Sequence, residues 1–163
     1  MSARETVERY LSALQRHSLK EVEELLSDEL EFVTPVETLD KQAFVEFIRG
    51  LFAGFPDWRF EHGPLFEDGE VVSTRLRMSG THTGILDLPL PGLKPLDPTG
   101  KAVTLPEQRF DYVVAGARII RIEGEPVPHA GVIGMLEQIG ARLPPLWVMR
   151  VVSRVRRLLG RGG

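Results

Sequence analysis

Polar side chains with hydrogen-bonding groups recur on the apolar faces of predicted strands and of the first helix. The two-residue period of a strand places His82 on the same side as Leu76 and Met78. The residues that share these faces are Tyr10, Trp58, Phe60, His62, Leu76, Met78, His82, Gln108, Phe110 and Tyr112. Aromatic and aliphatic walls with a few neutral polar groups suit a small hydrophobic molecule that carries oxygen atoms. We therefore expect these residues to line a ligand-binding pocket.

The polar members of this set also have purely structural interpretations. His82 lies in a turn, where its ring can hydrogen-bond the backbone. His62 precedes Gly63-Pro64 and can be a surface residue at the end of a strand. Tyr10 and Tyr112 can be core residues whose hydroxyls reach a polar rim. The sequence leaves both interpretations open.

Several other chemistries have no support in the sequence. Cysteine is absent, which excludes disulfides and thiol catalysis. The four histidines show no His-x-x-His or Glu-x-x-His spacing, and they are His17, His62, His82 and His129. No glycine-rich phosphate loop and no Gly-x-Ser-x-Gly motif occurs. We expect neither a metal nor an organic cofactor.

The elements that must position these residues are helices first and strands afterwards. Ser2 with Glu5 and Ser18 with Glu21 have capping-box spacing, and Asp40 is placed to cap a third helix. Alternating residues predict strands over 71–79, 102–115 and 118–123, with a leucine-rich loop over 86–100 that packs as a lid or arm. This order indicates an α+β fold, in which N-terminal helices pack on a curved antiparallel sheet.

Five short motifs resemble one known family. They are Phe55-Pro56-Asp57-Trp58, Gly80-Thr81-His82-Thr83-Gly84, Pro98-Thr99-Gly100-Lys101, Arg118-Ile119-Ile120 and Leu136-Glu137-Gln138-Ile139-Gly140. In their order and spacing the chain resembles the SnoaL-like polyketide (ester) cyclases of the nuclear-transport-factor-2-like superfamily. The resemblance implies a cone-shaped α+β domain, which we assign to residues 1–143.

The same resemblance implies a particular catalytic carboxylate. Family cyclases close a ring without cofactors, and an Asp about five residues beyond the Ile119 position moves the proton; here that position holds Gly124. Glu123 and Glu125 flank it, but strand alternation points both away from the face of Ile122. We therefore expect a ligand-binding protein. The alternative is a cofactor-free cyclase or isomerase that uses Glu123 or Glu125, with His82 as a further candidate.

The opposite face of the sheet is charged. Arg75, Arg77, Arg109 and Asp111 fall there, and we expect cross-strand ion pairs among them. In the superfamily this face often meets a second subunit, so the resemblance implies a homodimer.

The C-terminal segment, residues 144–163, predicts a basic amphipathic helix. Its apolar stripe is Trp147, Val148, Val151, Val155, Leu158 and Leu159, and its other side carries Arg150, Arg154, Arg157 and Arg161. We favour packing of the stripe on the domain or on a partner subunit. The alternative is contact with an anionic membrane, with Trp147 at the interface.

Charge and hydropathy limit the partners and the cellular location that we expect for the protein. The chain of 163 residues has a net charge of −3, and its basic stretch lacks a readout motif, so we expect no nucleic-acid partner. No secretory signal pattern and no apolar run of membrane-spanning length is found. We expect a cytoplasmic protein.

Overall fold

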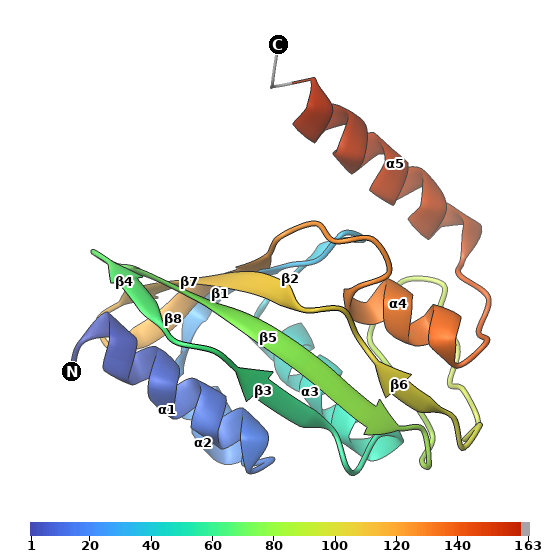
Figure 1. The fold of residues 1–163 in the computed structure, drawn as a ribbon, viewed down its shortest axis with the longest axis horizontal. Coiled ribbons are helices and arrows are strands. Elements are labelled where there is room, and N and C mark those ends of the chain that lie inside the picture. Colours follow the sequence, from blue (N-terminus) through green and yellow to red (C-terminus); the bar gives the residue numbers. More distant parts are fainter. Residues whose placement is uncertain (161–163) are drawn as a thin grey trace.

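The computed structural model describes residues 1–160, without the side chains of Val152, Arg154, Val155 and Leu158. The predictions for Arg154, Val155, Leu158 and Arg161 therefore lie outside the described part. The elements, shown in Figure 1, are α1 (Ala3–Gln15), α2 (Leu19–Glu24), β1 (Leu26–Val33), β2 (Thr38–Leu39), α3 (Lys41–Gly54), β3 (Arg59–His62), β4 (Phe66–Asp68), β5 (Val71–Thr81), β6 (Ala102–Thr104), β7 (Gln108–Ala115), β8 (Arg118–Gly124), α4 (Gly131–Gln138) and α5 (Pro145–Leu159).

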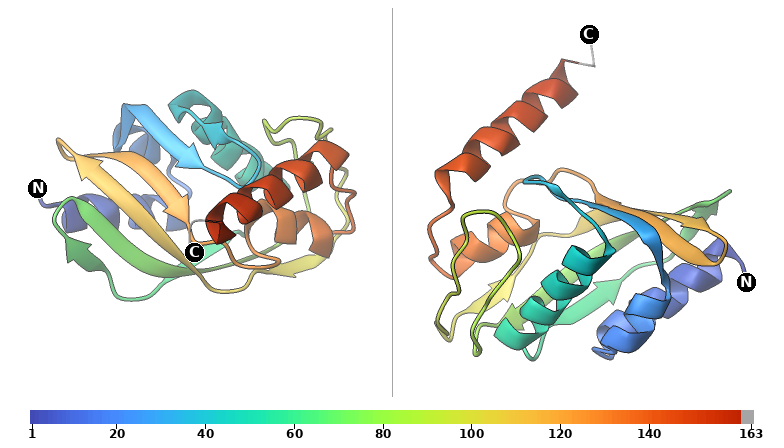
Figure 2. Two further views of the ribbon diagram at one scale, coloured as in Figure 1. Left: turned by 90° about the horizontal axis from the view of Figure 1, so that it is seen from above. Right: turned by 180° about the vertical axis from the view of Figure 1, so that it is seen from behind.

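One curled sheet organises the molecule. Its strand order is β2-β1-β8-β7-β5-β3, with β4 and β6 also paired to β5. β1 and β8 run parallel, and the remaining pairs are antiparallel. The helices α1, α2 and α3 lie on the concave side, as Figure 2 shows. The predicted α+β fold with N-terminal helices on a curved sheet is confirmed.

Two of the three predicted helix caps form. Ser2 Oγ accepts a hydrogen bond from the Glu5 backbone N–H at 3.1 Å, and Asp40 Oδ1 accepts one from Ala43 at 2.9 Å. Ser18 precedes α2 but its side chain makes no such bond. The apolar residues of α1 and α3 then face the sheet, which buries Tyr10 and Phe44.

The strand predicted over 102–115 is two strands. β6 ends at Thr104 and β7 begins at Gln108. Pro106 lies between them and has no backbone N–H to donate to a sheet ladder, so the pairing stops there. This break makes Gln108 the first residue of β7, opposite Leu76 of β5.

The long loop after β5 packs on the domain, as predicted. Leu86, Leu88 and Leu90 are buried, and Leu86 and Leu96 exchange backbone hydrogen bonds of 3.0 and 2.9 Å. α4 packs on β6, where the Gln138 amide bonds both the N–H and the carbonyl of Thr104. Beyond it, α5 projects away from the sheet (Figures 1 and 2). Within the described residues no helix has the length and apolarity needed to cross a bilayer.

Candidate functional site

Strand register brings aromatic residues together on the concave side of the sheet. Ile122 of β8 pairs with Phe32 of β1 on one side and with Tyr112 of β7 on the other. The three side chains therefore lie side by side across the sheet, on the same face. We call the residues gathered there the aromatic cluster: Tyr10, Phe32, Phe44, Phe47, Gln108, Phe110 and Tyr112. Its ring pairs are Tyr10–Tyr112 at 5.6 Å, Phe110–Tyr112 at 6.5 Å, Phe32–Phe44 at 4.5 Å and Phe32–Phe47 at 5.9 Å between centroids.

Phe32 and Phe110 are only half-buried, which leaves part of the cluster accessible. Phe32, Phe44 and Phe47 were not among the predicted ligand-binding residues. The signal was present for Phe32, which is in phase with buried Leu30 on β1. A similar signal was present for Phe44 and Phe47, which lie on the buried stripe of α3. Neither pattern, however, predicts that β1 and α3 pack against each other.

Gln108 supplies the polar group of the cluster. Its Nε2 donates to the backbone carbonyl of Glu125 at 2.8 Å, which fixes the amide orientation because that carbonyl requires a donor. Its Oε1 is buried and has no hydrogen-bond partner among the described residues. A buried acceptor without a partner reduces the stability of the folded protein, and it can accept a hydrogen bond from a donor on a ligand.

Gly124 occupies the position where the family resemblance places the catalytic Asp. It lies opposite Phe110, and a Cβ on Gly124 would come within 2.6 Å of Gln108 Nε2 and 3.0 Å of Phe110 Cε1. The side chain of Gln108 therefore fills the space that a carboxylate at position 124 would need. The sequence identified the missing acid but could not identify Gln108 as the residue in its place.

The two tyrosines can donate hydrogen bonds but cannot act as bases. Burial raises the pKa of both Tyr10 and Tyr112, and the proximity of Tyr112 adds to the effect on Tyr10. Both phenols therefore stay protonated at neutral pH. No hydrogen bond to either hydroxyl occurs within the described residues.

The two candidate glutamates lie away from the cluster. Glu123 accepts from Arg121 Nη2 at 3.0 Å, and Arg121 also binds Glu31, on the convex face of the sheet. Glu125 Oε1 accepts from the backbone N–H of Arg109 at 3.1 Å. This arrangement has the orientation that strand alternation predicts.

His82 belongs to a different part of the molecule, which we call the junction. It is fully buried, and its Nδ1 accepts from the backbone N–H of Thr99 at 3.3 Å and lies 3.1 Å from Thr99 Oγ1. The ring proton is therefore on Nε2, which has no partner within the described residues. The Phe55 ring stacks on the imidazole with centroids 5.2 Å apart. Burial lowers the pKa of His82.

The junction unites three of the motifs that carry the family resemblance. Asp57 Oδ1 accepts from the Thr81 N–H at 2.7 Å, which lowers the pKa of Asp57. His82 exchanges backbone hydrogen bonds with Lys101 and Gly100 at 2.9 and 2.8 Å. A Cβ on Gly80 would lie 2.7 Å from the Trp58 ring, so glycine allows the close approach. These contacts hold the end of β5 against the loop and the start of β3.

The remaining predicted residues divide between the core and the surface. Phe60, Leu76 and Met78 are buried core residues, and Trp58 packs on Phe55 in the junction. His62 is exposed at the end of β3, where its Nδ1 lies 2.8 Å from the Gly63 carbonyl. The chain turns at Gly63-Pro64 directly after His62, so alternation no longer carries its side chain inward.

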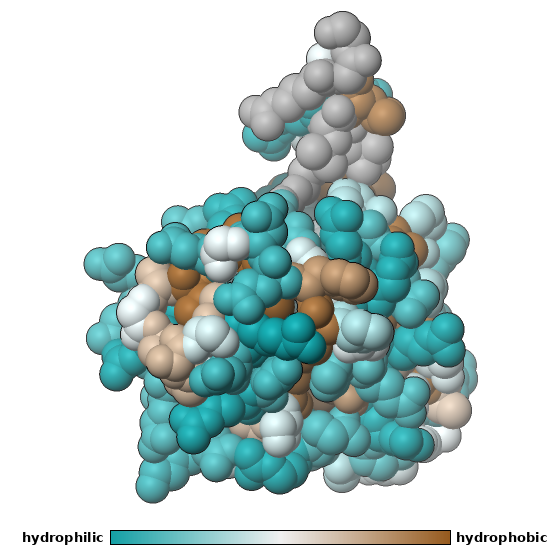
Figure 3. Space-filling view, turned by 60° about the vertical axis from the view of Figure 1, so that its left-hand side comes forward, coloured by the Kyte–Doolittle hydropathy of each residue, from teal (hydrophilic) through white to brown (hydrophobic). Residues whose placement is uncertain are grey.

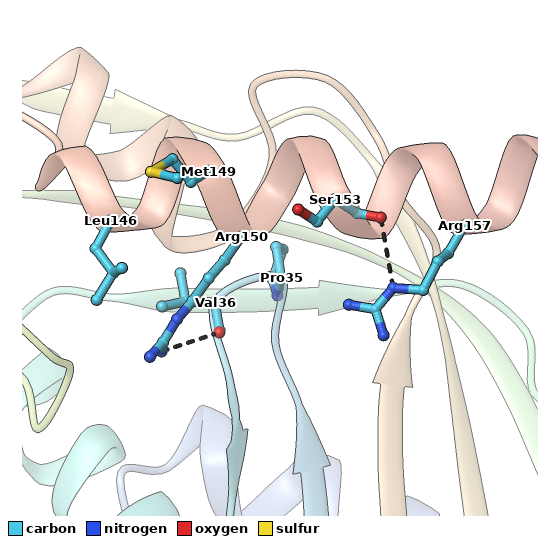
Figure 4. Close-up of a pocket in the computed structure, with 7 residues that line it drawn as sticks. All are labelled: Pro35, Val36, Leu146, Met149, Arg150, Ser153 and Arg157. Carbon is cyan, nitrogen blue, oxygen red and sulfur yellow. Dashed lines mark hydrogen bonds between the residues drawn. The ribbon is translucent and has the colours of Figure 1, made fainter.

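Two of the hollows on the surface of the described residues are lined by none of the ten predicted ligand-binding residues. One of about 470 Å³ is lined by Pro35, Val36, Leu146, Met149, Arg150, Ser153 and Arg157, drawn in Figure 4. One of about 450 Å³ is lined by Glu23, Asp28, Asp40, Lys41, Gln42, Val45, Glu46 and Arg49. Within residues 1–160 no group of three His, Asp or Glu side chains is arranged to hold a metal ion.

The charges on the convex face pair differently from the prediction. Arg109 contacts Asp111 on its own strand at 3.4 Å, and Asp111 accepts across the sheet from the Ser73 hydroxyl at 2.7 Å. Arg75 lies directly opposite Arg109, so the register places like charges together. Arg77 contacts Glu107 at 3.8 Å. The predicted cross-strand pairs among these four residues are therefore wrong, because the register decides which side chains meet.

A sequence model of the SnoaL-like domain family matches residues 7–124. Similar solved structures include AclR from Streptomyces galilaeus, a candidate hydroxylase, with TM-score 0.66, 16% identity, and 98% of this chain and 94% of AclR covered. IdmH from Streptomyces antibioticus, a candidate polyketide cyclase, has TM-score 0.63 and 18% identity over 86% of this chain and 100% of its own. A SnoaL-like polyketide cyclase from Agrobacterium tumefaciens has TM-score 0.61 and 21% identity over 86% of this chain and 99% of its own. No curated protein sequence matches the chain. At these identities the structures share the fold, which hosts many activities.

Proposed function

Because this chain belongs to the SnoaL-like domain family and has its cone-shaped α+β fold, we propose that it binds a small hydrophobic molecule against the aromatic cluster. The observation that carries the proposal is the buried, unpartnered Oε1 of Gln108 among aromatic rings. An orphaned acceptor in an apolar setting is costly unless a ligand supplies the donor. The half-buried rings of Phe32 and Phe110 give that ligand its access.

The hydrogen-bonding groups define the ligand class. Gln108 Oε1 requires a donor, such as a hydroxyl, and the neutral hydroxyls of Tyr10 and Tyr112 can donate to a carbonyl or ether oxygen. The rings around them favour a planar or aromatic body. A hydroxylated aromatic or related oxygen-bearing hydrophobic compound satisfies all three groups.

The alternative function is a cofactor-free cyclase or isomerase, the activity that the names of several structural neighbours suggest. It would need an acid–base group in the cluster, from Glu123, Glu125 or His82. The backbone carbonyl of Glu125 contacts the Gln108 amide, but its carboxylate accepts from the Arg109 N–H and would have to turn toward the cluster to act there. If a bound compound were converted by the native chain, and Glu125→Gln still bound that compound but no longer converted it, the result would favour this alternative over binding alone.

The binding proposal is tested with p-cresol and p-xylene, which differ in a hydroxyl against a methyl group. We expect p-cresol to raise the Tm more than p-xylene at equal concentration, because only p-cresol can donate to Gln108. Gln108→Leu removes the acceptor and should abolish that difference. Gln42→Leu, an exposed change on α3, should preserve it. A preference for p-cresol that survives Gln108→Leu contradicts the proposal.

We further propose that two copies pair in the cytoplasm through the convex face of the sheet. Support comes from Phe66 on β4, which is 69% exposed and faces the same side as Ser73. A large exposed aromatic side chain on a charged face is typical of an interface. Light scattering should report a dimer for the native chain and a monomer for Phe66→Glu; a native monomer contradicts this proposal.

A further inference from the structure

The C-terminal helix is attached to the domain at one end. Trp147 in its first turn is fully buried, and its indole Nε1 donates to the carbonyl of Pro91 at 2.5 Å. Trp147 is thus an anchor on the domain and does not have the membrane-interface position considered from the sequence. Beyond this turn α5 leaves the body, and hydrophobic side chains are exposed along it in Figure 3.

The helix turns Arg150 and Arg157 toward the body. Arg150, Ser153 and Arg157 line the hollow opposite Pro35 and Val36, as Figure 4 shows. Arg150 Nη1 reaches the Val36 carbonyl at 3.5 Å and lies 3.9 Å from a carboxylate oxygen of Glu37. Leu146 and Met149 line the same hollow, so the side of α5 toward the body is mixed, unlike that of the usual amphipathic helix, whose apolar side faces the core.

The opposite side of the helix is apolar and open. Residues two apart in a helix lie about 200° apart around its axis, which places Val148 opposite Arg150 and Leu159 opposite Arg157. Val148 is 50% exposed and Leu159 is 76% exposed. These two residues therefore do not pack on their own domain, and packing on a partner subunit, the other part of the favoured prediction, stays a prediction.

The positive charge of the C-terminal segment indicates which kind of surface can bind the apolar side of α5. All 23 acidic residues of the chain lie before Gln138, whereas the last 26 residues hold six arginines and no acid. Arg156 and Arg157 on α5 are exposed. An apolar stripe flanked only by positive charge matches a surface that is apolar inside and anionic at its rim.

We propose that α5 docks in the plane of an anionic lipid membrane, with Val148 and Leu159 in the acyl region and the exposed Arg156 and Arg157 at the headgroups. The projection of α5 from the body keeps the acidic domain away from that surface. A second copy of α5 fits less well, because pairing two such helices brings together segments with the same strong positive charge.

The test is co-sedimentation of the full chain with two kinds of vesicle, phosphatidylcholine alone and phosphatidylcholine mixed with phosphatidylglycerol. We expect binding to the mixed vesicles only, and weakening with added salt. Replacing both Val148 and Leu159 by Asp should lower the partition coefficient by about 100-fold, because the apolar anchors are lost. Arg156→Gln with Arg157→Gln should lower it by about 20-fold.

Ile85→Asp is the control, since Ile85 is 56% exposed and lies between β5 and β6, outside α5. It should bind the mixed vesicles as the native chain does. Equal binding to both kinds of vesicle, or to neither, contradicts the proposal. So does binding that survives Val148→Asp with Leu159→Asp. The chain could instead self-associate through α5 without binding vesicles, and those two substitutions would then abolish the self-association. That result would assign α5 to contact with a second copy and overturn the proposal.

Discussion

The junction and the aromatic cluster are both buried, but they treat polar groups differently. In the junction, Nδ1 of His82, the carboxylate of Asp57 and the backbone at Gly100 and Lys101 are joined by short hydrogen bonds. In the cluster, Oε1 of Gln108 is buried and accepts no hydrogen bond within the described residues. Within the described residues, the junction leaves two buried N–H donors without a partner, on His82 and Trp58, whereas the cluster leaves a buried acceptor, on Gln108.

This difference separates the residues that identify the family from those that define the site. The motifs around Phe55, Gly80 and Thr99 fix how β5 meets its loop, which any member of the fold needs. The identity of residue 124 and of its neighbour Gln108 decides what chemistry the interior supports. We therefore expect substitutions in the junction to reduce stability and substitutions in the cluster to alter binding.

The largest effect is expected for His82→Leu. It removes the acceptor of the Thr99 N–H in a fully buried setting, which should cost about 2–3 kcal/mol of unfolding free energy in urea titration. His62→Leu is the control, since that exposed histidine should change stability by less than about 0.5 kcal/mol. If both variants lost the same unfolding free energy, the junction would contribute no more to stability than an exposed turn does, which would contradict this prediction.

A smaller cost is expected for Gly124→Ala. The added Cβ meets Gln108 Nε2 at 2.6 Å, and overpacking of this kind costs about 1–2 kcal/mol. The loss should shrink when Gly124→Ala is combined with Gln108→Ala, because the obstructing amide is gone. A double-mutant cycle by urea unfolding measures this coupling; additive costs would show that Gln108 does not occupy the space next to Gly124.

Stability should also depend on pH through His82. In the unfolded chain a histidine takes up its proton near pH 6.5, whereas burial lowers the pKa of His82 in the folded state. The unfolded state therefore binds more protons as pH falls through that value, and the native chain should lose stability on acidification below it. His82→Gln should show a shallower loss in parallel urea titrations; an identical pH profile would argue against a buried neutral imidazole.

The smallest stability effect is expected for Gln108→Leu. It removes a hydrogen bond to Glu125 together with an unpartnered acceptor, so the two contributions should cancel to within about 1 kcal/mol. A loss as large as that of His82→Leu would mean that Gln108 serves the fold, and the contrast between the two regions would fail.

The sequence predicts the fold well because its signals are local and periodic. Capping at Ser2 and Asp40, alternation along β5 and the order of the motifs all act within a few residues, and the family resemblance is confirmed. The prediction of one strand over 102–115 missed the gap between β6 and β7, because Pro106 interrupts the alternating pattern on which that prediction rested.

The site was less predictable because it depends on register between distant strands. Gly124 and Gln108 meet only through the pairing of β7 with β8, and Arg75 meets Arg109 through that of β5 with β7. Alternation gives the face of a residue and not its neighbour. Likewise, the periodicity of α5 located its apolar stripe but not the side that turns toward the body.

A crystal structure of the protein soaked with p-cresol tests the central claim most directly. The account predicts the ring among Tyr10, Phe110 and Tyr112, with its hydroxyl about 2.7 Å from Gln108 Oε1. Electron density for p-cresol only in the hollow beneath α5, with the Gln108 acceptor still unpartnered, would contradict it.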